Sequence, residues 1–403
     1  MLFRILAFCG IAVFLQANAV PLFDTHPVLK DEIPHVTFNV YPTPVYNLHS
    51  IAQNYGLKAF YVKDDGANGL RDEQERVLPS GNKMRKLEFL LAHAKTLGYK
   101  TVCTVGSAGS NHALETAVCA KQLGLEAVLL LNDQRPTSYA IRNLKMMALF
   151  AKEIKYSSAD DDIKLMEEAQ ALCNNEGYYY IPLGGSNSRG ALGFVNAMFE
   201  LKDQINKGIL QEPDFIYIAL GSAGTASGAI IGAYAAGLKS IIIPVRISST
   251  ADFKTNLLIS LVNETGSWLK TIDPSFPFIS ATPENVRIEH NFAGGEDSYA
   301  RITDEAALAI DSFCQESKNA IGHLIKLEGT YTGKTLSALF GHAYQGILKD
   351  KVVLFWNTFS YGSFDELTSL VTDEQICHLI PAQLTHYFSD KLQDLDQGVE
   401  EKL

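Results

Sequence analysis

The sequence predicts an α/β fold with doubly wound parallel sheets. Short apolar or β-branched runs alternate with segments of helical periodicity through most of the 403 residues. Three of these runs, 215–220, 240–247 and 351–356, are apolar on both faces, as buried parallel strands are. A βαβ alternation with such strands gives a doubly wound architecture, in which ligands bind beyond the carboxyl ends of the strands.

The individual elements follow from the same patterns. Apolar residues recur at helical spacing from Met84 to Leu97, directly after a strand-like run and a polar loop. Besides the three buried runs, strands are predicted at 59–63, 100–105, 125–131 and 179–183. Helices are predicted at 84–97, 110–123, 138–154 and 162–175.

Residues 1–19 are predicted to be a signal peptide. Arg4 precedes an apolar run at 5–15, and Ala17-Asn18-Ala19 fits a small-x-small cleavage site. The alternative is an uncleaved anchor or a buried helix, but the run is shorter than the roughly 20 apolar residues that span a bilayer. We therefore expect an exported protein, periplasmic or secreted, without stable membrane insertion after cleavage.

Composition excludes some classes of partner. The formal net charge of −11 argues against a nucleic acid or an anionic membrane, because both require a basic face. Cleavage would remove Cys9 and leave five cysteines without CxxC or metal-ligand spacing, so no metal is expected. Cys103 and Cys119 lie in apolar segments and are predicted to be buried free thiols.

Lys83 is the first candidate functional residue. It lies in segment 80–88 (SGNKMRKLE), where a Gly-Asn turn places it at the beginning of a helix. The helix dipole disfavours a cation there by about 0.3–1 kcal/mol but leaves a neutral amine unaffected. A lysine with a lowered pKa, or one condensed as an imine, suits this position. The alternative is a solvated lysine on a basic first turn.

A small-residue loop, 221–228 (GSAGTASG), joins the strand at 215–220 to an apolar helix. Glycines let backbone N–H groups converge, and a helix N-terminus favours a phosphate. The loop lacks the Gly-Lys-Ser/Thr of a P-loop and a strict dinucleotide fingerprint, so a single phosphate is predicted. The alternative is a tight βα turn with close helix packing.

Segment 105–113 (VGSAGSNHA) repeats this pattern of strand, small-residue loop and helix. It is a candidate binding loop for a substrate carboxylate, in which Ser110 and Asn111 would point into the site. The alternative is that Ser110 is only an N-cap and His112 only a first-turn histidine. Two further polar segments are 327–335 (LEGTYTGKT) and 355–362 (FWNTFSYG), and HExxH, GxSxG and zinc-knuckle patterns are absent from the sequence.

Taken in this order, the five segments resemble the 1-aminocyclopropane-1-carboxylate deaminase/D-cysteine desulfhydrase family of fold-type II (tryptophan synthase β-like) pyridoxal-phosphate enzymes. The resemblance runs from about residue 36 to 362 and includes 41–44 (YPTP) and 60–65 (FYVKDD). It implies two doubly wound α/β domains with the active site between them, usually in a homodimer. The large cofactor domain would comprise residues 20–85 and 191–403, and the small α/β domain residues 86–190.

The resemblance also implies the cofactor, pyridoxal 5′-phosphate, and the residues that bind it. Lys83 would hold the cofactor covalently and shuttle protons, and Asn111 would hold its 3′-oxygen. The phosphate would be bound by Gly221, Ser222, Ala223, Gly224 and Thr225.

The substrate contacts are implied in the same way. Ser110 would meet the carboxylate of a small amino acid, or act as a nucleophile or acid, and His112 would contact the substrate beside it. Tyr331 would lie beside the pyridine ring. Segment 182–187 resembles the family's Gly-Gly-Ser loop between the domains.

Thr332 and Thr358 lead to the expected substrate. The resemblance implies Glu and Leu at these positions in cyclopropane deaminases, and hydroxyl residues in desulfhydrases. A threonine hydroxyl can serve the pyridine nitrogen without forcing its protonation, and β-elimination of thiolate needs less of the cofactor's electron sink. The preferred function is therefore D-cysteine desulfhydrase, which yields pyruvate, ammonia and sulfide.

Three alternatives stay open: a 1-aminocyclopropane-1-carboxylate deaminase, a serine/threonine-type dehydratase, and an exported amino-acid-binding protein without catalysis. The chain also departs from the family pattern. Phe359-Ser360 replaces Gly-Gly, Ala223 replaces a common glycine, and Asp297-Ser298-Tyr299 replaces Gly-Tyr-Gly. Phe359 is expected to lie near the cofactor ring and to reshape the substrate pocket.

Overall fold

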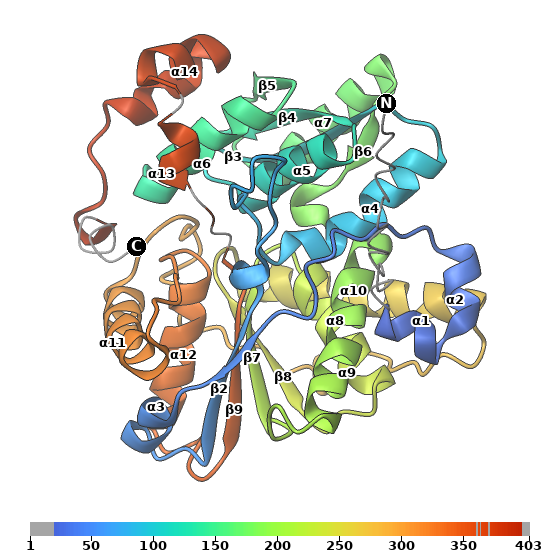
Figure 1. The fold of residues 1–403 in the computed structure, drawn as a ribbon, viewed down its shortest axis with the longest axis vertical. Coiled ribbons are helices and arrows are strands. Elements are labelled where there is room, and N and C mark those ends of the chain that lie inside the picture. Colours follow the sequence, from blue (N-terminus) through green and yellow to red (C-terminus); the bar gives the residue numbers. More distant parts are fainter. Residues whose placement is uncertain (1–19, 360–361, 363, 370, 397–403) are drawn as a thin grey trace, which may run out of the picture.

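The computed structural model describes residues 20–359, 362, 364–369 and 371–396, so the predicted signal peptide lies outside the described residues. The strands form two sheets, one above the other in Figure 1. None of the helices in these ranges combines the length and the apolar character that crossing a membrane requires.

The larger sheet has the strand order β1–β2–β9–β7–β8. Only β1 runs antiparallel to its neighbour, and the other pairs are parallel. The bounds are β1 (Val45–Asn47), β2 (Ala59–Asp64), β9 (Val352–Asn357), β7 (Phe215–Leu220) and β8 (Ile241–Arg246). The smaller, fully parallel sheet contains β5 (Glu153–Tyr156), β4 (Glu126–Asn132), β3 (Thr101–Ser107) and β6 (Tyr179–Ile181), in that order.

Helices cover both faces of each sheet (Figure 1). Their bounds are α1 (Pro21–Thr25), α2 (Pro27–Glu32), α3 (His49–Asn54), α4 (Lys83–Thr96), α5 (Asn111–Gln122), α6 (Ser138–Phe150), α7 (Asp162–Glu176), α8 (Ser188–Asn206), α9 (Gly224–Ala235), α10 (Ala251–Ile272), α11 (Asp304–Ile321), α12 (Thr332–Tyr344), α13 (Phe364–Thr368) and α14 (Asp373–Leu379).

The alternation of side chains along buried strands explains this two-sided packing. In β9, Leu354 and Trp356 pack on the side of α8, α9 and α10, whereas Val353 and Phe355 pack on the side of α11 and α12. In β4, Leu129 belongs to the core under α5 and α6. The predicted α/β architecture with parallel sheets is confirmed.

Two predicted boundaries are wrong. The helix predicted at 138–154 ends at Phe150 because β5 follows as a short edge strand, whose polar composition hides it from the sequence pattern. The strand predicted at 179–183 ends at Ile181, because Pro182 has no N–H to donate to a ladder and a 3-10 turn follows. Cys103 and Cys119 are buried and free, as predicted.

The division into domains stays a prediction. The smaller sheet is formed by residues between Thr101 and Ile181, and α4 runs across the predicted boundary at 85/86. This helix also packs against α8 of the larger part, so Lys83 begins an element that lies between the two sheets.

Candidate active site

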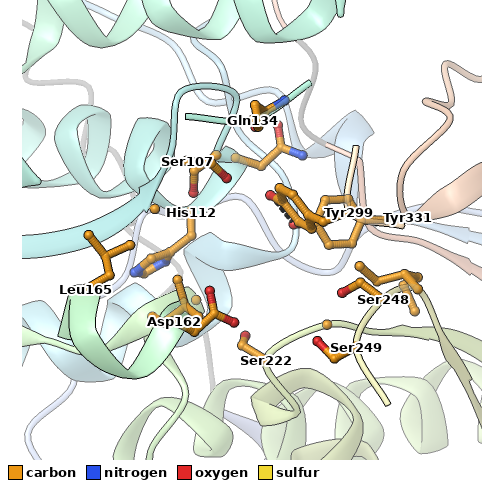
Figure 2. Close-up of a pocket in the computed structure, with 18 of the residues that line it drawn as sticks. Ser107, His112, Gln134, Asp162, Leu165, Ser222, Ser248, Ser249, Tyr299 and Tyr331 are labelled. Atoms are coloured by element: carbon orange, nitrogen blue, oxygen red, sulfur yellow. Dashed lines mark hydrogen bonds between the residues drawn. The ribbon is translucent and has the colours of Figure 1, made fainter. Parts of the chain in front are cut away.

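A pocket of about 500 Å³ lies between the two sheets, at the carboxyl ends of β3, β4, β7 and β9. Figure 2 shows His112, Ser222 and Tyr331 around the same cavity. Most of the predicted site residues line it: Lys83, Ser110, Asn111, His112, Gly221, Ser222, Ala223, Thr225, Tyr331 and Thr358. Within the described part of the chain, Gly224 and Thr332 are the predicted site residues that do not line this pocket.

Lys83 is the first residue of α4, and its side chain is half-buried. Its Nζ donates to Asn82 Oδ1 at 2.8 Å, and Asn82 Nδ2 donates to Thr225 Oγ1 at 3.1 Å. Burial lowers the pKa of Lys83, although Glu115 and other nearby carboxylates raise it in part. The geometry therefore provides an amine with reduced basicity, linked through Asn82 to the glycine-rich loop.

The loop 221–225 has the features of an anion cradle. β7 ends at Leu220 and α9 begins at Gly224, so the first amides of a 12-residue helix face the loop. A Cβ on Gly221 would lie 3.2 Å from the Tyr331 ring, and one on Gly224 would lie 2.6 Å from Ser186 Oγ. Glycine at these two positions lets the loop approach its neighbours closely.

Two lysines beside this loop were not predicted as functional. Lys86 Nζ donates to the carbonyl of Gly184 at 2.9 Å and to Ser186 Oγ at 3.3 Å, and Gly224 N donates to the same hydroxyl at 3.1 Å. Lys254 Nζ donates to the carbonyl of Gly221 at 2.8 Å and lines the pocket. Lys86 could have been predicted as a site residue, because it lies one helical turn after Lys83. No motif in the sequence around Lys254 indicates that it lies at the site.

Ala223 adopts a left-handed conformation, with φ of 69°. This conformation costs a residue with a Cβ about 1–2 kcal/mol, part of which the greater unfolded-state entropy of glycine would offset. Ala223→Gly is therefore expected to raise the free energy of unfolding of the cofactor-free protein by about 0.5–1 kcal/mol in urea titration. Ala226→Gly, in the right-handed helix that follows, should lower it by about 1 kcal/mol. A comparable loss in both variants would contradict this account.

Ser110 and Asn111 begin α5 at the end of β3. Ser110 Oγ accepts from Ala113 N at 3.2 Å, so Ser110 is an N-cap and also lines the pocket. Asn143 Nδ2 donates to Asn111 Oδ1 at 2.8 Å. Because its oxygen is held in this way, Asn111 keeps the Nδ2 group to donate to a ligand.

His112 is a neutral histidine with an assignable tautomer. Thr104 Oγ1 lies 2.9 Å from His112 Nε2 and also donates its single proton to the carbonyl of Ile181 at 2.9 Å. His112 Nε2 must therefore carry the proton of the first bond. Burial, with Lys83 and Lys86, holds the pKa of His112 well below its usual value, so the ring does not add a positive charge to the pocket.

Tyr331 and Tyr299 form a hydroxyl pair on one wall of the pocket (Figure 2). Their oxygens lie 2.8 Å apart, and their rings meet edge to face with centroids 6.0 Å apart. Burial and the neighbouring phenols hold the pKa of Tyr331 well above its usual value, and burial raises the pKa of Tyr299. Both hydroxyls therefore stay protonated: one proton makes the bond between them, and the other is left for a ligand. The sequence analysis did not predict Tyr299 as a site residue. The signal that could have indicated it is the tyrosine in 297–299, where the family has Gly-Tyr-Gly.

Two residues expected at the pocket do not line it in the described chain. Thr332 Oγ1 donates to the carbonyl of Glu328 at 3.0 Å and accepts from Glu328 N at 2.8 Å, so it closes the turn that leads into α12. Phe359 is buried and its ring lies 5.3 Å from the Arg142 guanidinium, and neither residue is among those that line the pocket in the described chain. Of the two threonines expected to indicate the substrate, only Thr358 lies at the site.

The chain is similar to known proteins in family, sequence and structure. The family model described as "Pyridoxal-phosphate dependent enzyme" matches residues 36–358. A Pyrococcus abyssi protein named "Putative 1-aminocyclopropane-1-carboxylate deaminase" is 31% identical over 350 residues, which cover 84% of this chain and 97% of that protein. A "D-cysteine desulfhydrase" of Klebsiella pneumoniae subsp. pneumoniae is 29% identical over 325 residues, which cover 79% and 91%.

Solved structures agree with these matches. The crystal structure of an "ACC deaminase homologue" superposes with a TM-score of 0.69 and 28% identity, and it covers 86% of this chain and 99% of that one. The processed form of threonine deaminase isoform 2 from Solanum lycopersicum matches with a TM-score of 0.54 and 13% identity over 89% of this chain and 93% of that one. The second likeness concerns the fold alone.

Proposed function

The chain belongs to the family of pyridoxal-phosphate dependent enzymes, and from this premise we propose that it is a lyase acting on a small amino acid, with D-cysteine as the preferred substrate. In the proposed reaction, D-cysteine and water give pyruvate, ammonia and hydrogen sulfide, without a net oxidation or reduction. The observation that carries the proposal is the meeting, in one pocket, of a lysine with a lowered pKa and a glycine-rich loop.

The residues present fit the family's cofactor, pyridoxal phosphate. The close-packed loop at 221–225 offers the first amides of α9 to a phosphate, with the ammonium group of Lys254 beside it. Lys83 offers an amine to the same pocket, and the Tyr331 ring lies beside it, with Lys83 Nζ 5.9 Å from the ring centroid. When bound, the cofactor supplies an electron sink that stabilises negative charge at the substrate Cα.

Lys83 has two roles in the proposed reaction. Its lowered pKa favours the neutral amine, which is the form that reacts with an aldehyde. With substrate bound, the neutral Lys83 Nζ would be the base that accepts the Cα proton. A pKa below the usual lysine value brings this base nearer to the pH at which it must work.

The remaining pocket residues would bind and orient the substrate. Ser110 and the amides that begin α5 would hold its carboxylate, and the Nδ2 group of Asn111 would donate to the cofactor oxygen, as the bond from Asn143 to Asn111 Oδ1 supports. Neutral His112 adds no positive charge to this region. The Tyr331–Tyr299 pair can donate a proton to a leaving group on the substrate side chain.

The choice of D-cysteine is supported by Thr358, a hydroxyl residue at the end of β9, and by the D-cysteine desulfhydrases among the relatives. Relatives named for 1-aminocyclopropane-1-carboxylate deamination support the second candidate. Because the Thr332 hydroxyl is bonded to Glu328, Thr358 is the only one of the two threonines that still distinguishes the desulfhydrase from the deaminase at this pocket.

The test is a comparison of substrates with the purified protein loaded with pyridoxal phosphate. We expect sulfide release from D-cysteine with a higher kcat/KM than from L-cysteine, and than ammonia release from 1-aminocyclopropane-1-carboxylate or D-serine. Lys83→Ala provides the background, because cysteine also reacts with free cofactor. Turnover of the cyclopropane substrate without turnover of D-cysteine would assign the deaminase activity. Cofactor bound to Lys83 without turnover of any substrate would leave the binding-protein alternative.

Export and dimerisation also belong to the proposal. Export is supported by the charged, apolar and small-residue pattern of residues 1–19, and N-terminal sequencing of the exported protein should begin at Val20. A start at Met1 in protein recovered from the cell interior would contradict it. The homodimer is supported by the family resemblance, and light scattering should give twice the mass of one chain.

A further inference from the structure

Glu115, on α5, is a buried carboxyl group at the first turn of α4. Its side chain is fully buried, and Oε2 accepts from the N–H groups of Gly81 at 2.9 Å and Met84 at 3.1 Å. The first N–H groups of a helix have no partner within the helix, and these two flank Lys83 in the sequence. Glu115 therefore fixes the backbone from which the Lys83 side chain begins.

The second oxygen, Glu115 Oε1, is buried without a hydrogen-bond partner among the described residues. A charge in such a place is costly because nothing solvates that side of the carboxylate. Burial raises the pKa of Glu115 to about 7, although Lys83 and the amides of Gly81 and Met84 lower it. The group is thus poised to change its charge near neutral pH.

The charges around Lys83 come from several elements. Three carboxylates face it: Glu115 from α5, Glu328 from the loop before α12, and Asp65 after β2. Asp65 is already paired with Arg85, and Glu328 accepts three amide hydrogens at α12.

The other titratable neighbours include Lys86 on the same helix, His112 on α5, and Tyr331, whose ring centroid lies 5.9 Å from Lys83 Nζ. Burial lowers the pKa of Lys86 and His112 and raises the pKa of Tyr331. Cys119, also on α5, lies close enough to Glu115 for the carboxylate to raise the pKa of its thiol, after burial. Glu115 is therefore the acid in this cluster that accepts from backbone N–H groups on both sides of Lys83 and keeps one oxygen unpaired among the described residues.

We propose that Glu115 is a positioning residue that sets both the place and the basicity of the Lys83 amine. As a carboxylate it holds the first turn of α4 and favours a proton on Lys83 Nζ. As a neutral acid it favours the free amine. The proposal rests on the proposed function, in which Lys83 carries the cofactor and accepts the Cα proton.

The experiment measures the pH at which Lys83 becomes reactive in the cofactor-free protein. Acetylation by acetic anhydride over a pH series, followed by peptide mapping, gives the midpoint for this one amine. Glu115→Gln keeps an oxygen for the amides of Gly81 and Met84 and removes the charge, so the midpoint should fall by about one pH unit or more. An unchanged midpoint would overturn the proposal.

Glu88→Gln is the matched control on α4. Glu88 is also buried, but its carboxylate accepts from Phe38 N and pairs with His35, away from Lys83. We expect it to leave the midpoint of Lys83 where it is, and an equal shift in both variants would overturn the proposal.

The wild-type curve supplies a test that needs no variant. Because Glu115 and Lys83 interact, the acetylation curve should be broader than a single-proton titration. A single-proton curve in the wild type would count against the proposal even if Glu115→Gln failed to fold.

The loaded enzyme separates this inference from the proposed function. Borohydride reduction followed by peptide mapping shows whether the cofactor is attached to Lys83. Absorbance recorded against pH shows whether Glu115→Gln lowers the pH midpoint of the absorbance change of the bound cofactor. Cofactor on Lys83 with neither midpoint altered would remove the role of Glu115 and leave the function standing. Cofactor on another lysine would remove the function, while the acetylation midpoint would still decide the effect of Glu115.

Discussion

Replacing Lys83 by alanine is expected to lower kcat/KM by at least about 10³-fold and to abolish the covalent attachment of the cofactor. The effect is large because one amine would both hold the cofactor and accept the Cα proton. The fold should persist, because the half-buried side chain opens onto the pocket and Lys83 is the first residue of α4. The measurements are sulfide release, the visible absorbance of the loaded protein, and unfolding in urea.

Lys95→Ala is the matched control, since Lys95 lies on the same helix with its side chain exposed to solvent. It should keep full activity and the visible absorption band. If Lys83→Ala retained the band, or if the reduced cofactor mapped to another lysine, the assignment of the whole site would be wrong.

Glu200→Ala is expected to produce the largest loss of stability, about 3–5 kcal/mol in the free energy of unfolding. Glu200 is buried on α8 and pairs with Arg85 Nη1 at 2.9 Å and with Lys63 Nζ at 2.5 Å. Removing the carboxylate would leave Arg85 with Asp65 alone and would leave Lys63 buried without an anionic partner. The same network lies two residues from Lys83, so cofactor affinity should fall as well.

The matched control for this prediction is Glu153→Ala, which removes a solvent-exposed pair with Lys155. Such a pair contributes about 0–1 kcal/mol, so the unfolding midpoint should barely move. Equal losses in the two variants would show that the buried network contributes no more than a surface pair.

The contribution of Glu200 should also depend on pH. Burial alone would raise the pKa of Glu200, but Arg85 and Lys63 lower it to about 2 from its usual value of 4.5. A group whose folded-state pKa is lowered contributes its stability above the unfolded value and loses it as the pH falls through the folded value. The difference between wild type and Glu200→Ala should therefore shrink between pH 4.5 and about 2. A difference that grows on acidification would contradict this reading.

The local parts of the site could be predicted from the sequence. Each of them is recognisable in a short continuous stretch of sequence: Lys83 at the start of a helix, the glycine-rich loop after β7, and the small-residue loop after β3. Their meeting in one pocket follows from parallel strands, whose carboxyl ends share one edge. The resemblance to known enzymes then suggested a role for each residue, and the match over residues 36–358 shows the family.

Contacts between distant segments were beyond sequence reasoning. Glu115 meets Gly81 from 34 residues away, Glu200 meets Lys63 from 137 residues away, and Tyr299 meets Tyr331 from another loop. The direction of a neighbouring side chain was equally hidden, since Thr332 follows Tyr331 directly but donates its hydroxyl to the Glu328 carbonyl and does not line the pocket. Side-chain direction at a helix start depends on which acceptor the packed structure brings near, and no local pattern carries that information.

By itself, the sequence determined the α/β class and the positions of Lys83 and of the two small-residue loops at helix starts, because periodicity and glycine placement act within one element. The tertiary structure alone decided the charge around the lysine, the tyrosine pair and the loss of Thr332 from the site. These depend on burial and on partners from other elements, and both are set only when the two sheets close around the pocket.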